Sequence, residues 1–178
     1  MTSKEPESPA GTEKVPVVEL RRTYLVEREV KVPVQVRGPL STIEVDTLLD
    51  SGATGCFVDK SWAPERHLQL SKQVKPVPVL NVDGTRNQEG DITHYVLLTV
   101  SIGKHAEKLW CAVTCLGKTP LILGHTWLKK HNPDIDWTTG AVKLNRCPPE
   151  CKTLLETHFH QQTNPCPVQA WPALAKLS

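Results

Sequence analysis

The stretch Leu48-Leu49-Asp50-Ser51-Gly52-Ala53 decides how the rest of the sequence is interpreted. Asp50 follows an alternating apolar run that begins at Ile43, so we expect it at the end of a strand rather than on an open surface. Gly52 lets the backbone turn sharply and brings its N–H group close to the carboxylate. The segment therefore predicts an acidic side chain on a tight loop that follows a strand.

Apolar residues alternate with other residues on both sides of this loop, with the period of two that is typical of half-buried strands. Glycine, asparagine and proline separate the runs, as expected for turns. About eight short strands and one or two short helices predict a mostly β domain, a closed antiparallel barrel, over residues 20–147. The clearest runs are 30–36, 43–49, 77–79, 92–102, 109–113, 121–123 and 135–144.

One helix is predicted after the run at 121–123. It covers 127–131, with Thr126 as its cap and Asn132-Pro133 as its end. We expect the side chains of Trp127 and Trp137 in the hydrophobic core.

Composition excludes several classes of protein. The chain has 178 residues, a formal net charge of +2 and a mean hydropathy of -0.30, so nucleic acid is not indicated as a partner. No apolar run approaches the ~20 residues that a membrane span needs, so no membrane partner is expected.

Residues 1–19 are predicted to be disordered, and 148–178 form a predicted Pro/Cys-rich tail or linker. Six cysteines without an export signal favour reduced thiols and a cytoplasmic location.

An acid on such a loop predicts a specific chemistry when two loops face each other. Two carboxylates in contact cannot both ionise, so the pair shares one proton. The ionised member activates a water molecule as general base while the protonated member acts as general acid on a peptide carbonyl. This chemistry needs no metal and no cofactor, and none is predicted.

Other interpretations of these residues are open. Asp50 alone is compatible with a loop acid that caps a turn, and Ser51 is compatible with a nucleophile. The second is disfavoured because the sequence has no Gly-x-Ser-x-Gly segment and no assignable histidine partner. Zinc binding by the tail is a further alternative, although the spacing fits no standard finger; its ligands would be Cys147, Cys151, His158, His160 and Cys166.

A second segment, Leu121-Ile122-Leu123-Gly124, follows Asp50 after about 70 residues. Together the two segments resemble the paired signatures of retropepsins, the retroviral-type aspartic proteases. The stretch LILGHTWLKKHNPDIDWTTGAVKL (121–144) resembles Gypsy-type LTR retrotransposon polyproteins, particularly those of fungi. The resemblance covers about residues 20–151 and implies an aspartic endopeptidase that processes a retroelement polyprotein.

The resemblance also implies residue roles and a partner. Because the chain has a single Asp-Ser-Gly, the second carboxylate must come from another copy in a homodimer. The alternative is a domesticated or decayed fold that acts as a non-catalytic dimeric interaction module. The implied roles are catalytic for Asp50, Ser51 and Gly52, substrate-binding in a flap for Asp83, Gly84 and Thr85, and active-site support for Ala53, Leu123 and Gly124.

Overall fold

The computed structural model describes residues 29–81, 83–153 and 175–176. The segment 1–19 predicted to be disordered, and most of the predicted tail, lie outside these ranges. Within the described ranges, no helix has the length and hydropathy needed to cross a lipid bilayer. The helices are α1 (Trp62–Glu65), α2 (His125–His131) and α3 (Glu150–Thr153). The strands are β1 (Lys31–Arg37), β2 (Thr42–Asp50), β3 (Phe57–Asp59), β4 (Ser71–Val77), β5 (Val79–Leu80), β6 (Ile92–Ile102), β7 (His105–Thr114), β8 (Leu121–Gly124), β9 (Asp134–Asp136), β10 (Ala141–Lys143) and β11 (Ala175–Lys176).

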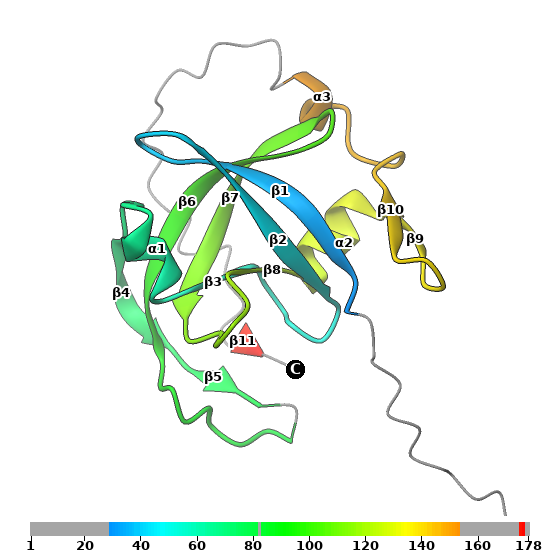
Figure 1. Ribbon diagram of the computed structural model, residues 1–178. Helices are drawn as coiled ribbons and strands as arrows, with labels where there is room; N and C mark the ends of the chain where they lie inside the picture. The colour runs from blue at the N-terminus through cyan, green and yellow to red at the C-terminus, as the bar shows by residue number, and fades with distance from the viewer. Residues whose placement is uncertain (1–28, 82, 154–174, 177–178) are drawn as a thin grey trace, which may run out of the picture.

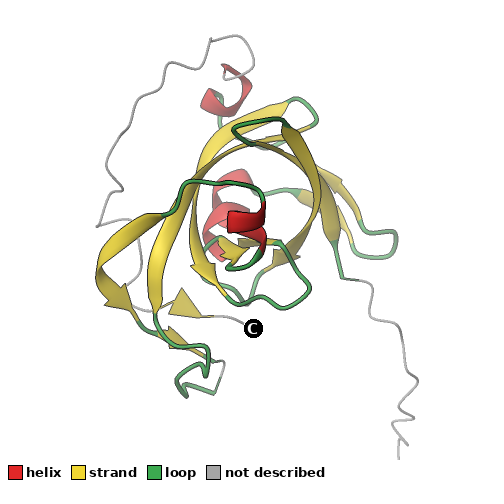
Figure 2. Cartoon of the chain, turned by 60° about the vertical axis from the view of Figure 1, so that its left-hand side comes forward, coloured by secondary structure: helices red, strands yellow, loops and turns green. Residues whose placement is uncertain are grey.

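Six strands close into a barrel in the order β1-β2-β8-β3-β7-β6, because β1 pairs with both β2 and β6. Figure 2 shows these strands as a ring seen nearly end on. Strand β4 lies outside the ring, where it pairs with β6 (Figure 1). The prediction of a mostly β, closed barrel is confirmed.

Two of the six pairings in the barrel are parallel, so the predicted antiparallel arrangement needs a correction at these places. β2 pairs in parallel with β8, and β3 pairs in parallel with β7, whereas the other four pairings are antiparallel. A parallel pair needs a long crossover instead of a hairpin, and the chain between β2 and β8 supplies one. As a result the carboxyl ends of β2 and β8 lie at the same edge of the barrel.

The core follows the alternation of the sequence. In β1 every second residue is buried, and Val34 and Val36 have no exposed surface. Val36 lies opposite Ile43 on β2 and opposite Val100 on β6, so this residue of β1 connects three strands. Burying a valine side chain fully contributes roughly 1.5–3 kcal/mol. This stripe therefore holds the barrel closed.

The structure corrects two predictions about tryptophan and helix α2. Trp127 is buried, but Trp137 is 72% exposed, so its assignment to the core is wrong. Trp137 lies in the turn of the β9–β10 hairpin, which is a separate two-stranded sheet outside the barrel. Helix α2 begins at His125 and has Gly124 as its cap, so Thr126 lies inside the helix instead of capping it.

The described fold continues past the predicted boundary at residue 147. Helix α3 packs on β7, and its Cys151 is buried. Further along, β11 pairs in parallel with β5. The first residues of the predicted tail thus belong to the packed structure.

Candidate active site

Asp50 is the last residue of β2 and lies beside Gly124 at the end of β8. The Gly52 N–H group donates a 2.8 Å hydrogen bond to Asp50 Oδ1. Asp50 is half-buried, and Ser51 next to it is exposed. The carboxylate is therefore held by its own loop at the surface, where a substrate or a second chain can reach it.

The first turn of α2 holds the backbone of this loop. The His125 N–H group donates to the Ala53 carbonyl oxygen at 2.6 Å, and the Thr126 N–H group donates to the Thr54 carbonyl oxygen at 3.2 Å. Amides in the first turn of a helix have no acceptor inside that helix, so the loop supplies it. These two bonds explain why α2 needs no side-chain cap, and they fix the loop whatever its side chains are.

Position 124 needs glycine because there is no room for a side chain. Its backbone conformation is not the reason, since a φ of -92° is open to any residue. A Cβ atom at this position would lie 2.6 Å from the Ala53 carbonyl oxygen and still closer to the Gly55 carbonyl oxygen. Both contacts are with backbone, which cannot rotate away. Strand β8 thus passes directly against the Asp50 loop, and the neighbouring Leu123 and Ala53 are fully buried.

The residues predicted to form a flap lie on a separate hairpin. Asp83 Oδ1 accepts hydrogen bonds from the Thr85 N–H group at 2.9 Å and from Thr85 Oγ1 at 2.7 Å. The Thr85 hydroxyl and amide hold the pKa of Asp83 below its ordinary value. Gly84 has a φ of +84°, which favours glycine, and Leu80 bridges Arg86 across the hairpin. Asp83 therefore stabilises its own turn.

The structure brings together two of the three predicted groups. Residues 50–53 and 121–124 meet through the parallel pairing of β2 with β8 and through the bonds to α2. Residues 83–85 form a turn of their own, at the end of the hairpin beyond β5.

Asp59, which the sequence alone did not single out, orders the loop after β3. Its Oδ1 accepts from the Ser61 N–H, the Ser61 hydroxyl and the Trp62 N–H groups, and its Oδ2 accepts from the Leu116 N–H group. Burial alone would raise the pKa of Asp59, but these hydrogen bonds together hold it below its ordinary value. An acid two residues before a serine and three before a helix is the signal that could have revealed it.

Glu107 on β7 is a second residue that the sequence alone did not single out; this buried carboxylate is 4% exposed. Its Oε1 accepts from Trp127 Nε1 at 2.6 Å and from His105 Nε2 at 3.1 Å, and its Oε2 accepts from Lys130 Nζ at 2.9 Å. His131 Nε2 lies 2.9 Å from Oε1. Burial alone would raise the pKa of Glu107, but the surrounding histidines and lysine hold it well below its ordinary value. A charge inside the fold is stable only with such partners.

The signal for Glu107 lay in the alternation of β7. Glu107 is in step with Leu109, Cys111 and Val113, so its side chain belongs to the same face as these apolar residues. An acid in such a position indicates a buried carboxylate. Its partner His105 lies on the same strand, but Trp127, Lys130 and His131 come from α2, and no sequence pattern connects α2 with β7.

Comparison with protein-family models assigns most of this region. Residues 46–152 match the PEG10/RTL1 protease domain. The chain belongs to this family. The segment shared with the PEG10/RTL1 protease domain runs from β2 to α3 and so includes the Asp50 loop, Gly124 and Glu107. The predicted membership of a retroviral-type protease family is confirmed at this level.

Solved structures also resemble the chain at low sequence identity. The retroviral protease-like domain of Ddi1 from Leishmania major is 20% identical; the match covers 66% of this chain and 88% of that one, with a TM-score of 0.46. EIAV protease in complex with the inhibitor HBY-793 is 15% identical, with 64% and 98% covered and a TM-score of 0.45. The protease of simian foamy virus (mac) is 13% identical, with 56% and 91% covered and a TM-score of 0.35.

Proposed function

We propose that the chain is an aspartic endopeptidase that acts as a homodimer, with one Asp50 from each copy in a shared site. The observation that carries the proposal is the position of Asp50. Its carboxylate is held at the end of β2 by a loop whose backbone is bound to α2. The sequence holds one Asp-Ser-Gly segment, so the second carboxylate must come from a second copy.

The mechanism follows from two carboxylates in contact. They share one proton, because both cannot be ionised at that distance. The ionised Asp50 takes a proton from the attacking water, and the protonated Asp50 of the other copy donates a proton to the peptide carbonyl oxygen. In the proposed dimer, the Ser51 hydroxyl hydrogen-bonds across the two loops. Activity is expected to peak at mildly acid pH, where the pair holds one proton.

The substrate class forms part of the same proposal. We assign the chain to polyprotein processing of a Gypsy-type retroelement, with the hairpin at Asp83, Gly84 and Thr85 acting as a flap over a bound peptide. An extended peptide suits a site between hairpins because its backbone can pair with their edges. We also propose a cytoplasmic location, a compartment in which cysteine thiols stay reduced.

The test is cleavage of a peptide library between pH 4 and 7, with and without an active-site inhibitor of aspartic proteases. Asp50→Asn should lower the rate at least ~10²-fold, because an amide cannot act as general base or share a proton. Asp46→Asn is the matched control, since Asp46 is an exposed acid on the same strand. If the folded wild type cleaves nothing, the endopeptidase proposal fails and a non-catalytic module remains; equal rates for Asp50→Asn and wild type would exclude Asp50.

A further inference from the structure

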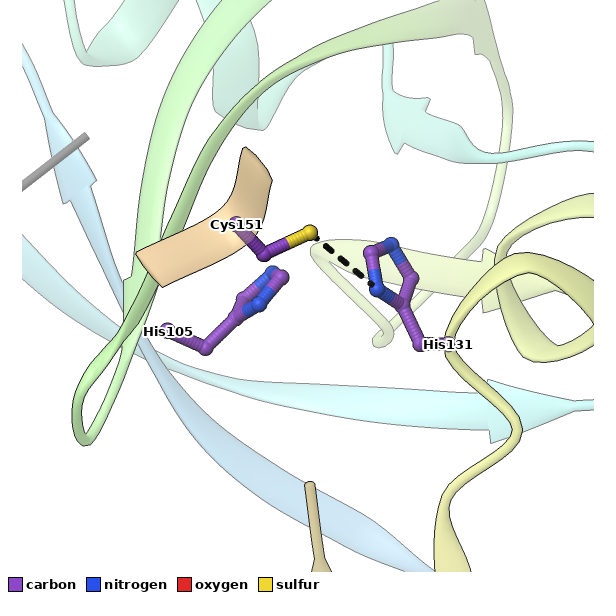
Figure 3. Close-up of side chains that lie close together, drawn as sticks. All are labelled: His105, His131 and Cys151. Atoms are coloured by element: carbon purple, nitrogen blue, oxygen red, sulfur yellow. Dashed lines mark hydrogen bonds between the residues drawn. The ribbon is translucent and has the colours of Figure 1, made fainter. Parts of the chain in front are cut away.

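Three side chains from different elements meet beside Glu107. They are His105 on β7, His131 at the end of α2 and Cys151 on α3, and all three are buried. One nitrogen or sulfur atom from each lies within 4.8 Å of the others. Figure 3 shows both imidazole rings turned toward the Cys151 sulfur.

The orientation of the two imidazoles leaves one nitrogen of each ring on the side away from Glu107. The Nε2 atoms of His105 and His131 lie 3.1 and 2.9 Å from Glu107 Oε1. His131 Nδ1 lies 3.8 Å from the Cys151 sulfur. His105 Nδ1 is buried and makes no hydrogen bond within the described residues. A buried polar atom without a partner costs free energy that a ligand would recover.

We propose that His105, His131 and Cys151 bind a zinc ion. Two imidazole nitrogens and one thiolate are a donor set that zinc prefers, and hard cations such as Mg²⁺ disfavour it. A carboxylate that holds the other nitrogen of a histidine is the usual support of such a ligand. Glu107 Oε1 accepts a hydrogen bond from His105 Nε2 and lies 2.9 Å from His131 Nε2. Tetrahedral zinc spaces nitrogen and sulfur ligands by roughly 3.3–3.8 Å. The pair His131–Cys151 already has this spacing.

An adjacent pocket provides the fourth position and an entry path. It has a volume of about 320 Å³, and its lining includes His105, Cys147 and Cys151. A water molecule would complete the tetrahedron from this side. The ion would connect α3 to β7 and α2, at the end of α2 opposite the Asp50 loop. The site thus lies apart from the proposed acid–base chemistry, and its test does not depend on protease activity.

The sequence alternative of a zinc site within the tail makes a different prediction. His158, His160 and Cys166, which that alternative needs, lie outside the described residues. The structure instead joins Cys151 to two histidines that precede the tail by many residues. Variants can therefore separate the two sites.

The first experiment uses the full, untagged, metal-free chain. Calorimetric titration should show one Zn²⁺ bound per chain, and the melting temperature should rise with Zn²⁺ but stay constant with Mg²⁺. Co²⁺ should give the intense visible bands of a tetrahedral site with a thiolate-to-metal band in the near ultraviolet. Absence of Zn²⁺ binding, or a Co²⁺ spectrum without a thiolate band, would overturn the proposal without any variant.

The second experiment compares variants by affinity. Losing a supporting residue costs roughly 10–100-fold in metal affinity, so Cys151→Ser, which removes a ligand, should lose at least ~100-fold. Cys115→Ser is the matched control, because Cys115 is a half-buried cysteine just beyond the other end of β7. Circular dichroism must show that both variants are folded. Undiminished binding by Cys151→Ser, or binding abolished by Cys166→Ser together with His158→Ala, would place the metal elsewhere and refute the assignment.

Discussion

The two ends of α2 hold the chain's two notable carboxylates by different means. At the first turn, two backbone N–H groups bind the loop that carries Asp50. Farther along the helix, from its third residue to its last, the side chains of Trp127, Lys130 and His131 surround Glu107. Asp50 is half-buried at the surface, whereas Glu107 is 4% exposed.

Because the two carboxylates are held differently, the two ends of α2 should tolerate different substitutions. Bonds between backbone groups do not depend on side-chain identity, so the Asp50 end is sensitive mainly to volume at Gly124. The Glu107 end depends on the charge and shape of every member, because a buried carboxylate must keep its donors. The first end is arranged to present a charge, and the second is arranged to neutralise one.

The largest effect on stability is expected at the side-chain end. Glu107→Gln replaces an acceptor oxygen by an amide that faces histidine, tryptophan and lysine donors. Breaking a buried ionic network in this way should lower the free energy of unfolding by about 3–5 kcal/mol in urea denaturation. Glu44→Gln, an exposed acid on β2, should change it by less than about 0.5 kcal/mol. If Glu107→Gln and Glu44→Gln both changed the free energy of unfolding by this small amount, the Glu107 network would not stabilise the fold.

At the backbone end, Gly124→Ala should displace the Asp50 loop. The added methyl group meets the Ala53 and Gly55 carbonyl oxygens, so we expect a loss of about 3 kcal/mol in the free energy of unfolding. Gly38→Ala is the control, because its Cβ would meet Ser41 O at 3.0 Å and the flexible end of Ile43 at 3.2 Å. A Gly124→Ala protein as stable as Gly38→Ala would contradict the close approach of β8 to the loop.

Asp59 provides an intermediate case, a carboxylate satisfied mostly by backbone donors. Asp59→Asn should cost about 2 kcal/mol at neutral pH, since it weakens charge-assisted bonds to Ser61 and Leu116. In the folded chain, the pKa of Asp59 lies below its ordinary value of 3.8. Its contribution is therefore present above pH ~4 and lost as pH falls through the lower folded-state pKa. Urea denaturation at several pH values should show wild type and Asp59→Asn converging in acid; a gap that stays constant down to low pH would argue against this role.

The smallest effect is expected where α2 ends. Asn132 closes the helix with a φ of 42°, in the left-handed region that glycine adopts most easily. Asn132→Gly removes the strain of the left-handed conformation but also increases the entropy of the unfolded chain. The net result should be a free energy of unfolding that is higher by about 0.5 kcal/mol. Lys129→Gly, on the exposed face of the same helix, should lower it by about 1 kcal/mol. Changes of the same sign at both positions would contradict the cap geometry.

The sequence predicts those parts of the molecule that local patterns determine, and it does not predict those that tertiary packing determines. The barrel strands and the Asp50 loop followed from local patterns, because alternation and the glycine of a tight turn are recorded within a few residues. The pairing of 50–53 with 121–124 followed only from the family resemblance. Trp137 was misplaced because a tryptophan beside a turn looks the same in sequence whether the hairpin is inside or outside the barrel. The Glu107 cluster escaped because its members are fixed by tertiary packing of β7, α2 and α3.

The central claim, a site shared between two copies, is tested most directly by mixing chains. Wild type is combined with increasing amounts of inactive Asp50→Asn, with equal amounts of Asp46→Asn as the control, and peptide cleavage is measured after subunits exchange. A mixed dimer has only one ionisable Asp50, so activity per wild-type chain should fall in proportion to the wild-type fraction. Activity per wild-type chain that stays constant at every ratio would show that one chain is sufficient and would contradict the account.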